Sequence, residues 1–342
     1  MRILVAMSGG VDSSVAAALL RDAGHDVLGA TMKLWGGPSD SGCCSVADVE
    51  DARRVAQQLG IAHHVFNFTA DFDARVVEPY VAAHGAGLTP NPCIECNRHL
   101  KFGRFLRRAR QLGFEAVATG HHARVVREAG GRRRLLRGRD RAKDQSYVLS
   151  VLGQDQLAAC LLPVGELTKP AVRAHAQALG LRTASKPDSQ DVCFITSTGG
   201  RGAFLSGRME LHRGRLVDLA TGQVVGAVPA VELVTVGQRR GLGGEGRRRY
   251  ALAVDVAGRA VTVGSEDDVL TDEVRLGAPT WTDVPLEPGA RVQAQLSAHG
   301  RPVDAIFEGG RVRFLEPHRR VAPGQTVALY DGDVVLGAAL AV

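Results

Sequence analysis

The sequence has no long apolar run. No stretch approaches the roughly 18 apolar residues that a membrane-spanning helix needs, so we predict no membrane partner. The opening residues, MRILVAMSGG, enter a strand pattern at once, which predicts neither a signal nor a transit peptide. We therefore expect a cytoplasmic protein whose thiols stay reduced. Its six cysteines are interpreted as chemistry or core rather than as a disulfide framework.

Lysine is also scarce. Only five lysines occur, and arginine supplies the rest of the 42 basic residues, which face 36 acidic ones. The formal net charge of +6 is a weak indication of a polyanionic partner such as nucleic acid. An apolar share of 45% and a charged share of 23% over 342 residues predict a folded protein of two or three domains. A monomer is the default expectation.

The first two hundred residues alternate short apolar runs with helical patterns. Strands are expected in RILVAM, HDVLGATMKL, HHVFNF and EAVATG, and helices over Val11–Ala23, VADVEDARRVAQQLG and Asn97–Leu112. This alternation predicts an α/β domain with a mainly parallel sheet, whose ligands collect at the carboxyl ends of the strands. An arginine-rich stretch, residues 130–145, interrupts it as a hairpin or loop.

After about residue 200 the sequence changes to short β-branched runs separated by turn residues. This pattern is typical of small antiparallel barrels or sandwiches. We therefore expect an α/β domain over residues 1–198, followed by two small antiparallel β domains over 199–271 and 272–342.

The stretch AMSGGVDSS, residues 6–14, directly follows the first strand. It carries neither the dinucleotide fingerprint G-x-G-x-x-G nor the lysine-bearing P-loop G-x-x-x-x-G-K-[ST]. Backbone N–H groups of Ser8 to Val11, at a helix N-terminus, are expected to hold a phosphate. Asp12 is a candidate Mg²⁺ ligand. A loop without lysine suits cleavage at the α-phosphate, and SGGxDS after a first strand is the signature of the adenylating (PP-loop) ATPases. The alternative is an ordinary capped strand–turn–helix.

Cysteines in two further segments point to sulfur chemistry. TPNPCIECNRHLKFG (89–103) places Cys96 before the helix expected at Asn97, so the helix end is expected to lower the thiol pKa from about 8.5. SKPDSQDVCFI (185–195) places Cys193 between a polar stretch and an apolar run. Two such thiols suit sulfur transfer, in which one carries a persulfide and the other resolves it as a disulfide.

Together these segments resemble the tRNA-specific 2-thiouridylase (MnmA/TrmU) family over essentially the whole chain. The resemblance also includes GCCS (42–45), ATGHHAR (118–124), LLRGRDRAKDQSYVL (135–149) and PGQTVALYDGDVVLG (323–337). It implies that ATP adenylates the 2-carbonyl oxygen of the wobble uridine, position 34, in the tRNA anticodon stem-loop. It further implies that a cysteine desulfurase or a sulfur-relay protein loads a persulfide onto Cys193. Cys96 is then the nucleophile that releases the sulfur and closes a transient Cys96–Cys193 disulfide.

The resemblance also implies roles for individual residues. ATP contacts carry over to Ala6, Met7, Ser8, Gly9, Gly10, Val11, Asp12, Ser13, Met32 and Gly120. The segment that meets the target base corresponds to Asn91, Pro92 and Cys93, and such a base must leave the anticodon stack to be reached. Other tRNA contacts carry over to His121, Lys143, Asp144, Gln145 and Gln325.

The chain departs from the family pattern at two places. Cys93 stands where the family often has Asp, which creates a C-x-x-C motif with Cys96. Some members have an Arg-Tyr pair near the first strand of the C-terminal barrel, and this chain has Gln295–Leu296 at roughly that position instead. An iron–sulfur cluster on Cys93, Cys96 and Cys193 is an alternative to the persulfide route, but it is not favoured. Structural zinc is less favoured because a closed site needs four ligands, so we predict no protein-held metal.

Two other functions compete with tRNA thiolation. One is another adenylating enzyme of the same superfamily, and the two cysteines argue against it. The other is a non-catalytic RNA-binding protein, which the intact loop argues against. Cys160 is expected to be a core residue, and the sequence assigns no role to Cys43 and Cys44.

Overall fold

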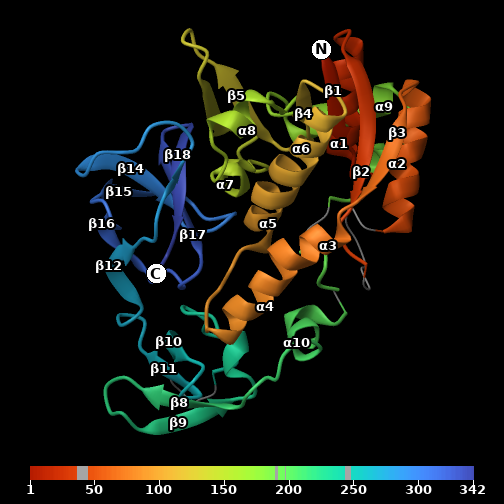
Figure 1. The fold of residues 1–342 in the computed structure, drawn as a ribbon. Coiled ribbons are helices and arrows are strands. Elements are labelled where there is room, and N and C mark those ends of the chain that lie inside the picture. The colour runs from red at the N-terminus through yellow and green to blue at the C-terminus, as the bar shows by residue number, and fades with distance from the viewer. Residues whose placement is uncertain (37–44, 189–191, 197, 243–247) are drawn as a thin grey trace.

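The protein's structure is a computed structural model that describes residues 1–36, 45–188, 192–196, 198–242 and 248–342 (Figure 1). Cys43 and Cys44, with most of the GCCS motif, lie outside the described residues, as do Ser189, Gln190 and Asp191 of the Cys193 segment. No helix in the described part of the chain combines the length and apolar character needed to cross a membrane.

A five-stranded parallel sheet lies at the centre of the first two hundred residues. Its order is β3 (His63–Asn67), β2 (Asp26–Lys33), β1 (Arg2–Ala6), β4 (Ala116–Ala118) and β7 (Cys160–Leu161). The inner strands are nearly continuous apolar runs because both faces of the sheet are covered. The α/β expectation for this part of the chain is thus confirmed.

Two groups of helices bury the two faces of this sheet in separate apolar clusters. One cluster takes its helical residues from α1 (Val11–Asp22), α2 (Val46–Leu59) and α9 (Lys169–Ala178). The other takes them mainly from α3 (Thr69–Phe72), α4 (Glu78–Gly85), α5 (Pro92–Glu95), α6 (Phe105–Gln111), α7 (Ser146–Leu149) and α8 (Gln154–Ala158). Wide π-helical turns over Asp73–Val77 and Cys96–Arg104 join α3 to α4 and α5 to α6.

The helix that carries Cys96 begins earlier than its sequence pattern suggested. It runs from Pro92 rather than from Asn97 and continues through the π-helical turn into α6. Asn91 is the N-cap, with its side chain accepting a hydrogen bond from the backbone N–H of Cys93 at 3.0 Å. Asn at the N-cap followed by Pro at the first helical position is a helix-start signal, so the expected boundary was wrong.

The second sheet has four strands and belongs to the middle of the sequence. Its order is β10 (Tyr250–Asp255), β11 (Ala260–Gly264), β8 (Gly214–Asp218) and β9 (Val224–Val228). All its pairs are antiparallel except β11 with β8, which are parallel. A short helix, α10 (Gly200–Ser206), precedes it, and short 3₁₀ turns occur at Arg182–Ser185 and Val231–Leu233.

The third sheet is antiparallel and has nine strands. It contains β12 (Leu270–Arg275), β13 (Thr280–Trp281), β14 (Ala290–Gln295), β15 (Val303–Phe307), β16 (Arg311–Arg319), β17 (Thr326–Asp331) and β18 (Val334–Leu340). The remaining two strands, β5 (Ala123–Arg127) and β6 (Arg133–Arg137), come from the α/β part of the sequence. They form the hairpin expected near the arginine-rich stretch, and β6 pairs with β18 at Leu136 and Val334. This pairing ties the α/β part of the chain to its C-terminal sheet.

Candidate active site

The SGG turn is shaped by close backbone contacts that only glycine permits. Gly9 has a positive φ of 74°, and a Cβ there would lie 2.2 Å from the carbonyl oxygen of Asp48. A Cβ at Gly120, after β4, would lie 2.5 Å from the backbone nitrogen of Ser13. Both glycines therefore let neighbouring elements press against the start of α1, at the carboxyl ends of β1 and β4.

Hydroxyl groups lock the turn from within. Ser13 Oγ accepts the backbone N–H of Ser8 at 3.2 Å and donates to the carbonyl of Gly10 at 3.1 Å. Ser14 Oγ donates to the same carbonyl at 2.8 Å. The N–H of Ser8, which sequence reasoning gave to a phosphate, is thus engaged inside the loop, where it fixes the turn.

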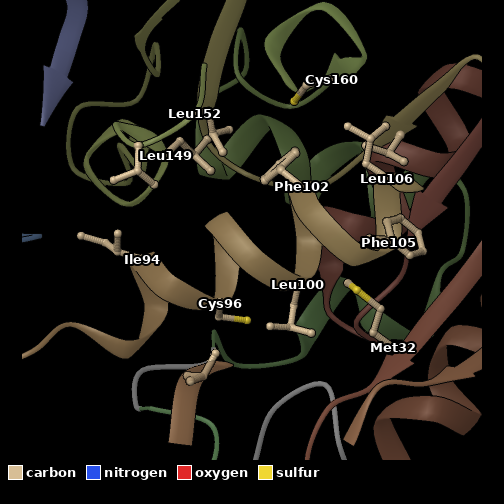
Figure 2. Close-up of a cluster of buried hydrophobic side chains, with 14 of the residues drawn as sticks. Met32, Ile94, Cys96, Leu100, Phe102, Phe105, Leu106, Leu149, Leu152 and Cys160 are labelled. Carbon is tan, nitrogen blue, oxygen red and sulfur yellow. The ribbon is translucent and has the colours of Figure 1, made fainter. Parts of the chain in front are cut away.

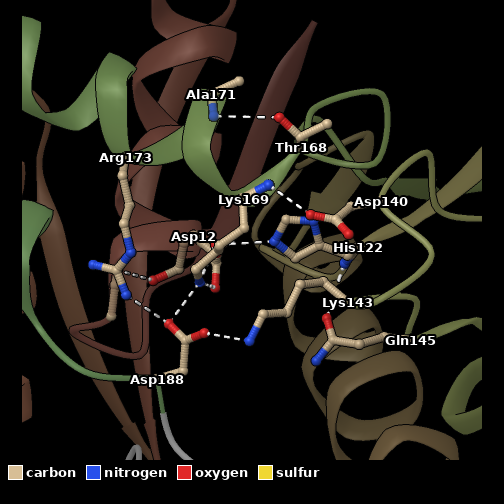
Figure 3. Close-up of polar contacts among 12 residues, drawn as sticks. Asp12, His122, Asp140, Lys143, Gln145, Thr168, Lys169, Ala171, Arg173 and Asp188 are labelled. Carbon is tan, nitrogen blue, oxygen red and sulfur yellow. Dashed lines mark hydrogen bonds and ion pairs between the residues drawn. The ribbon is translucent and has the colours of Figure 1, made fainter. Parts of the chain in front are cut away.

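The loop has no lysine of its own, but Lys169, which is distant in the sequence, contacts its Asp12 (Figure 3). Lys169 Nζ, at the start of α9, lies 2.8 and 2.7 Å from the two carboxylate oxygens of Asp12. His122 Nε2 lies 3.0 Å from one of the same oxygens. Burial acts to raise the pKa of Asp12, but its bonds to His122 and Lys169 outweigh burial and lower it. Asp12 is therefore an anion in a buried charge network.

Asp188 extends this network toward the segment that carries Cys193. Its carboxylate contacts Lys169 at 2.8 Å, Lys143 at 2.9 Å and Arg173 at 3.0 Å. Burial favours the neutral acid, yet the hydrogen bonds and charges of Lys169 and Lys143 prevail and lower the pKa of Asp188 to about 2. Lys169 thus bridges Asp12 of the loop and Asp188 (Figure 3).

A third lysine supports the loop from the other side. Lys186 Nζ donates to the carbonyl of Gly9 at 3.0 Å and contacts Asp48 and Asp51 of α2 at 2.5 and 2.7 Å. Lys169 and Lys186 thus contact the SGG loop, and Lys143 contacts Asp188 next to Lys169. Sequence reasoning named Lys143 as a tRNA contact but missed Lys169 and Lys186. Their rarity in an arginine-dominated chain was the available signal, because the compact ammonium fits where a planar guanidinium does not.

The residues around Asp12 do not fit a Mg²⁺ ion held by that side chain. Both carboxylate oxygens are bonded to Lys169, and one also meets His122. Magnesium demands near-ideal octahedral oxygen coordination, and a lysine ammonium in contact with both oxygens opposes it. The positive charge in contact with Asp12 is that of Lys169.

Cys96 lies inside its helix and not at the N-terminus. It is 8% exposed and belongs to the second turn of a helix that starts at Pro92. The helix dipole acts within the first turn, so the expectation that Cys96 stands just before the helix, where that dipole is strongest, was wrong. Cys93 occupies that first turn and is exposed. Surrounding protein nevertheless desolvates the Cys93 thiolate and raises its pKa, while the charge of Lys101 acts in the opposite direction.

Cys96 and Cys193 share one apolar cluster although they are far apart in the sequence. Cys96 and Met32, near the end of β2, are buried members (Figure 2). Cys193 packs against the cluster and is partly buried. Next to Cys193, Phe194 is anchored between Trp35 and Phe204, with ring centroids at 6.0 and 4.9 Å. The cluster thus joins the nucleotide-loop edge of the sheet to both cysteines.

The other cysteines have simpler positions. Cys160 is a buried core residue, as expected, and burial raises the pKa of its thiol. Among the described side chains, no three of His, Cys, Asp and Glu are grouped to hold a metal ion.

The ATP contacts expected from the family resemblance all lie at one edge of the parallel sheet. The side chains of Ala6, Met7, Val11 and Met32 are buried, so only their backbone atoms are available to a nucleotide. Gly120 presses on the backbone of Asp12 and Ser13. These residues therefore shape the edge, and the polar groups come from Ser8, Ser13 and the lysines.

The expected tRNA contacts are divided between exposed and buried positions. Lys143 is partly exposed beside Asp188, and Gln145 Oε1 accepts a hydrogen bond from the backbone N–H of His122 at 2.9 Å.

His121 is buried. Its Nδ1 lies 2.7 Å from Thr119 Oγ1, and its Nε2 lies 3.3 Å from Lys101 Nζ. The Asp144 carboxylate is bonded to Arg137 and Ser146. Pro92 is buried, and Gln325 precedes β17 with its backbone bonded to Ala341.

Replacing Asp188 by asparagine is expected to destabilise the fold by about 1–2 kcal/mol at neutral pH, less than the full pKa shift implies because solvent screens the pair. The carboxylate's folded pKa of about 2 lies below its ordinary 3.8. The stabilisation is therefore complete above the unfolded pKa and is lost as pH falls toward 2. Urea unfolding of wild type and Asp188→Asn near pH 7 and near pH 3 measures this. An equal difference at both pH values contradicts the ion-pair explanation.

Comparison with known proteins assigns the chain to a family. The model of the tRNA methyl transferase HUP domain matches residues 1–197, and that of the aminomethyltransferase beta-barrel domain matches 271–341. The tRNA-specific 2-thiouridylase MnmA of Roseiflexus sp. (strain RS-1) is 45% identical over 98% of both chains. That of Mycobacteroides abscessus is 46% identical over 99% of both.

A solved structure of a 4-thiouridine synthetase with RNA and ATP covers 56% of this chain and 44% of its own, at a TM-score of 0.36 and 17% identity. It is a partial likeness only. The near full-length relatives and the family model over the first 197 residues are sufficient on their own. This chain belongs to the tRNA-specific 2-thiouridylase (MnmA) family of PP-loop enzymes.

Proposed function

We propose that the protein is an ATP-dependent tRNA sulfurtransferase that converts the wobble uridine, position 34, to 2-thiouridine. One observation carries the proposal: a single apolar cluster contains Met32, at the nucleotide-loop edge of the sheet, together with Cys96 and packed against Cys193. Adenylation and sulfur transfer act on the same uridine carbon, so the groups for both must adjoin. The near full-length 2-thiouridylase relatives support the same reaction.

Adenylation comes first. The 2-carbonyl oxygen of the uridine attacks the α-phosphorus of ATP, the bond to the β-phosphate oxygen breaks, and pyrophosphate leaves. Lys169 is the cation beside the loop that compensates the phosphate charge. The uridine oxygen, once bonded to AMP, becomes a good leaving group. Mg²⁺ enters this proposal as the usual companion of ATP and not as a ligand of Asp12.

Sulfur transfer follows. The terminal sulfur of a persulfide on Cys193 attacks C2 of the uridine, and AMP leaves with the former carbonyl oxygen. The thiolate of Cys96 then attacks Sγ of Cys193, which breaks the sulfur–sulfur bond and leaves its electron pair on the sulfur now held by the uridine. The products are 2-thiouridine, AMP and a Cys96–Cys193 disulfide. An external dithiol must supply two electrons to restore both thiols.

The binding roles complete the proposal. ATP is held by residues 6–13 with Met32 and Gly120, the target base meets Asn91 to Cys93, and further tRNA contacts fall on His121, Lys143, Asp144, Gln145 and Gln325. The buried positions among them act through the backbone or by holding their neighbours. A cysteine desulfurase or relay protein loads Cys193, and the enzyme works as a cytoplasmic monomer.

The domain boundaries are proposed at 1–198, 199–271 and 272–342. The separate sheets of the α/β part and of the middle of the chain support this division, as do the matched ranges 1–197 and 271–341. The β5–β6 hairpin crosses the division because it pairs with β18.

The decisive experiment is nucleoside analysis of tRNA from cells that lack the protein. Loss of 2-thiouridine, restored by the wild-type gene, is the expected result. Unchanged thiolation contradicts the proposal and favours another adenylating modification of tRNA. A gene carrying Cys193→Ser is the matched control, since it keeps the nucleotide loop and removes the proposed sulfur carrier.

Lys143→Ala is expected to weaken tRNA binding and to lower the slope of log affinity against log salt by about one, as for one lost phosphate contact. Lys143 is 39% exposed on its side chain and pairs with Asp188, so it is accessible to RNA. Fluorescence titrations over a range of salt measure the slope, with Lys33→Ala, an exposed lysine at the end of β2, as the control. An unchanged slope assigns Lys143 to the Asp188 ion pair alone.

A further inference from the structure

Lys101 is a lysine whose positive charge no acidic side chain neutralises. Three other lysines each contact a carboxylate, those at positions 143, 169 and 186. Lys101 lies in the π-helical turn over Cys96–Arg104 and is partly buried, yet within the described residues it forms no ion pair. Its Nζ lies instead 3.3 Å from Nε2 of His121. An ammonium that lacks a counter-ion in the protein is suited to bind an anionic group of a substrate.

The ring of His121 holds this ammonium in place. Because an ammonium only donates hydrogen bonds, Nε2 of His121 is the acceptor, and Nδ1 carries the proton and donates it to Thr119 Oγ1 at 2.7 Å. Burial above all, helped by the positive charges of Lys101 and His122, keeps the pKa of His121 well below its ordinary value. The ring is therefore neutral at neutral pH, and it engages one N–H of Lys101 while two remain for a ligand.

Lys101 adjoins both halves of the candidate active site. On one side, its partner His121 directly follows Gly120, which packs against the backbone of Ser13 in the SGG loop. On the other side, the charge of Lys101 acts on the thiol of Cys93 and opposes the rise in its pKa that burial causes. The ammonium thus lies near the nucleotide-loop edge of the sheet and near the helical turn that meets the target base in the proposed function.

We propose that Lys101 is a further catalytic residue that acts in sulfur transfer rather than in adenylation, and that His121 positions it. When sulfur attacks C2 of the adenylated uridine, negative charge passes to the oxygen that leaves with AMP. The ammonium of Lys101 donates a hydrogen bond to this departing oxygen and stabilises the charge as it develops; it keeps its proton throughout. During adenylation the same oxygen donates electrons and gains no charge, so Lys101 does not accelerate that step. This inference rests on the proposed function, since it takes adenylated uridine to be the intermediate.

The test separates the two steps in a single turnover. Enzyme carrying the persulfide is in saturating excess over tRNA, and the ATP is labelled at its α-phosphate. In Lys101→Met, the label is expected to enter the RNA within about twofold of the wild-type rate, whereas 2-thiouridine forms about a hundredfold more slowly. Labelled, adenylated tRNA therefore accumulates. Because the enzyme is in saturating excess, a weaker affinity for RNA does not produce this result, and the retained adenylation shows that the variant is folded.

Three further variants distinguish a charge effect from a structural one. Lys101→Arg keeps the charge and is expected to retain more than about a tenth of the sulfur-transfer rate. His121→Phe keeps a ring but removes the acceptor, and is expected to slow sulfur transfer alone by about tenfold. Lys33→Met, an exposed lysine at the end of β2, is the matched control and keeps both rates.

Two results overturn the inference alone: an equal loss of both steps in Lys101→Met, or an unchanged rate of thiolation in that variant. If wild-type enzyme forms neither adenylated RNA nor 2-thiouridine, the proposed function itself falls and takes the inference with it.

Discussion

Serine at Cys96 or at Cys193 is expected to reduce thiolation to background, whereas Cys93→Ser keeps more than about a tenth of the wild-type rate. The reason is the separate positions of the three thiols. Cys96 is a buried member of the apolar cluster against which Cys193 packs, while Cys93 is exposed in the first helical turn. A tenth of the rate corresponds to a barrier increase of only about 1.4 kcal/mol. An increase of this size indicates that Cys93 lies near the reacting thiols without itself reacting.

The measurement is 2-thiouridine formed per enzyme after aerobic purification with a persulfide donor. Serine is nearly isosteric with cysteine, so the apolar packing around residue 96 is largely kept. The three serine variants carry the same chemical change at different positions, and each therefore serves as a control for the other two. If Cys93→Ser is as inactive as the other two, and anaerobic wild-type protein carries stoichiometric iron and sulfide, the two-cysteine route is wrong. A cluster ligated by all three thiols then replaces it.

Lys169→Met is expected to lower adenylation by at least about a hundredfold, the effect of removing one preorganised charge from a transition state. Lys169 is 7% exposed and bridges Asp12 and Asp188. Its loss leaves two carboxylates beside the loop without their shared cation, and they then repel the triphosphate. The measurement is tRNA-dependent release of pyrophosphate from ATP.

Lys169→Arg tests the geometry at constant charge. The ammonium of Lys169 lies 2.7 Å from the Asp12 carboxylate and 2.8 Å from the Asp188 carboxylate. A planar guanidinium is larger and cannot occupy the same point. We therefore expect the adenylation rate to fall by at least about tenfold, the scale of one mispositioned charge-assisted hydrogen bond. Lys33→Arg, exposed at the end of β2, is expected to remain fully active. Wild-type rates in Lys169→Arg contradict the role given to the compact ammonium and return Asp12 to consideration as a Mg²⁺ ligand.

Local sequence signals were sufficient to predict most element boundaries of the α/β part. Helix α1 begins at Val11 directly after the two glycines, and α2 ends at Leu59 before Gly60, whose φ is 69°. These boundaries depend on signals a few residues long: apolar periodicity, N-caps and the freedom of glycine at positive φ. The same kind of signal, Asn91 followed by Pro92, was present at the Cys96 helix and was overlooked in favour of the periodicity from Asn97.

The chemistry-bearing motifs were also determined by the sequence, because the SGGVDSS loop and the two cysteine segments are continuous stretches whose spacing is visible in one dimension. Their order and spacing carried the family resemblance that the full-length relatives confirmed. The sequence did not show that Cys96 and Cys193 pack on one cluster, although pairing them required it.

The charges that face the loop, and the strand with which the arginine-rich hairpin pairs, could not be predicted from short stretches of sequence. Lys169, Lys186 and Lys143 reach the SGG loop and Asp188 from separate elements, and β6 joins β18 across nearly two hundred residues. Nothing in a short window specifies such contacts. They follow from how layers stack and strands pair, and the contact energy that holds them exists only after the intervening chain has folded.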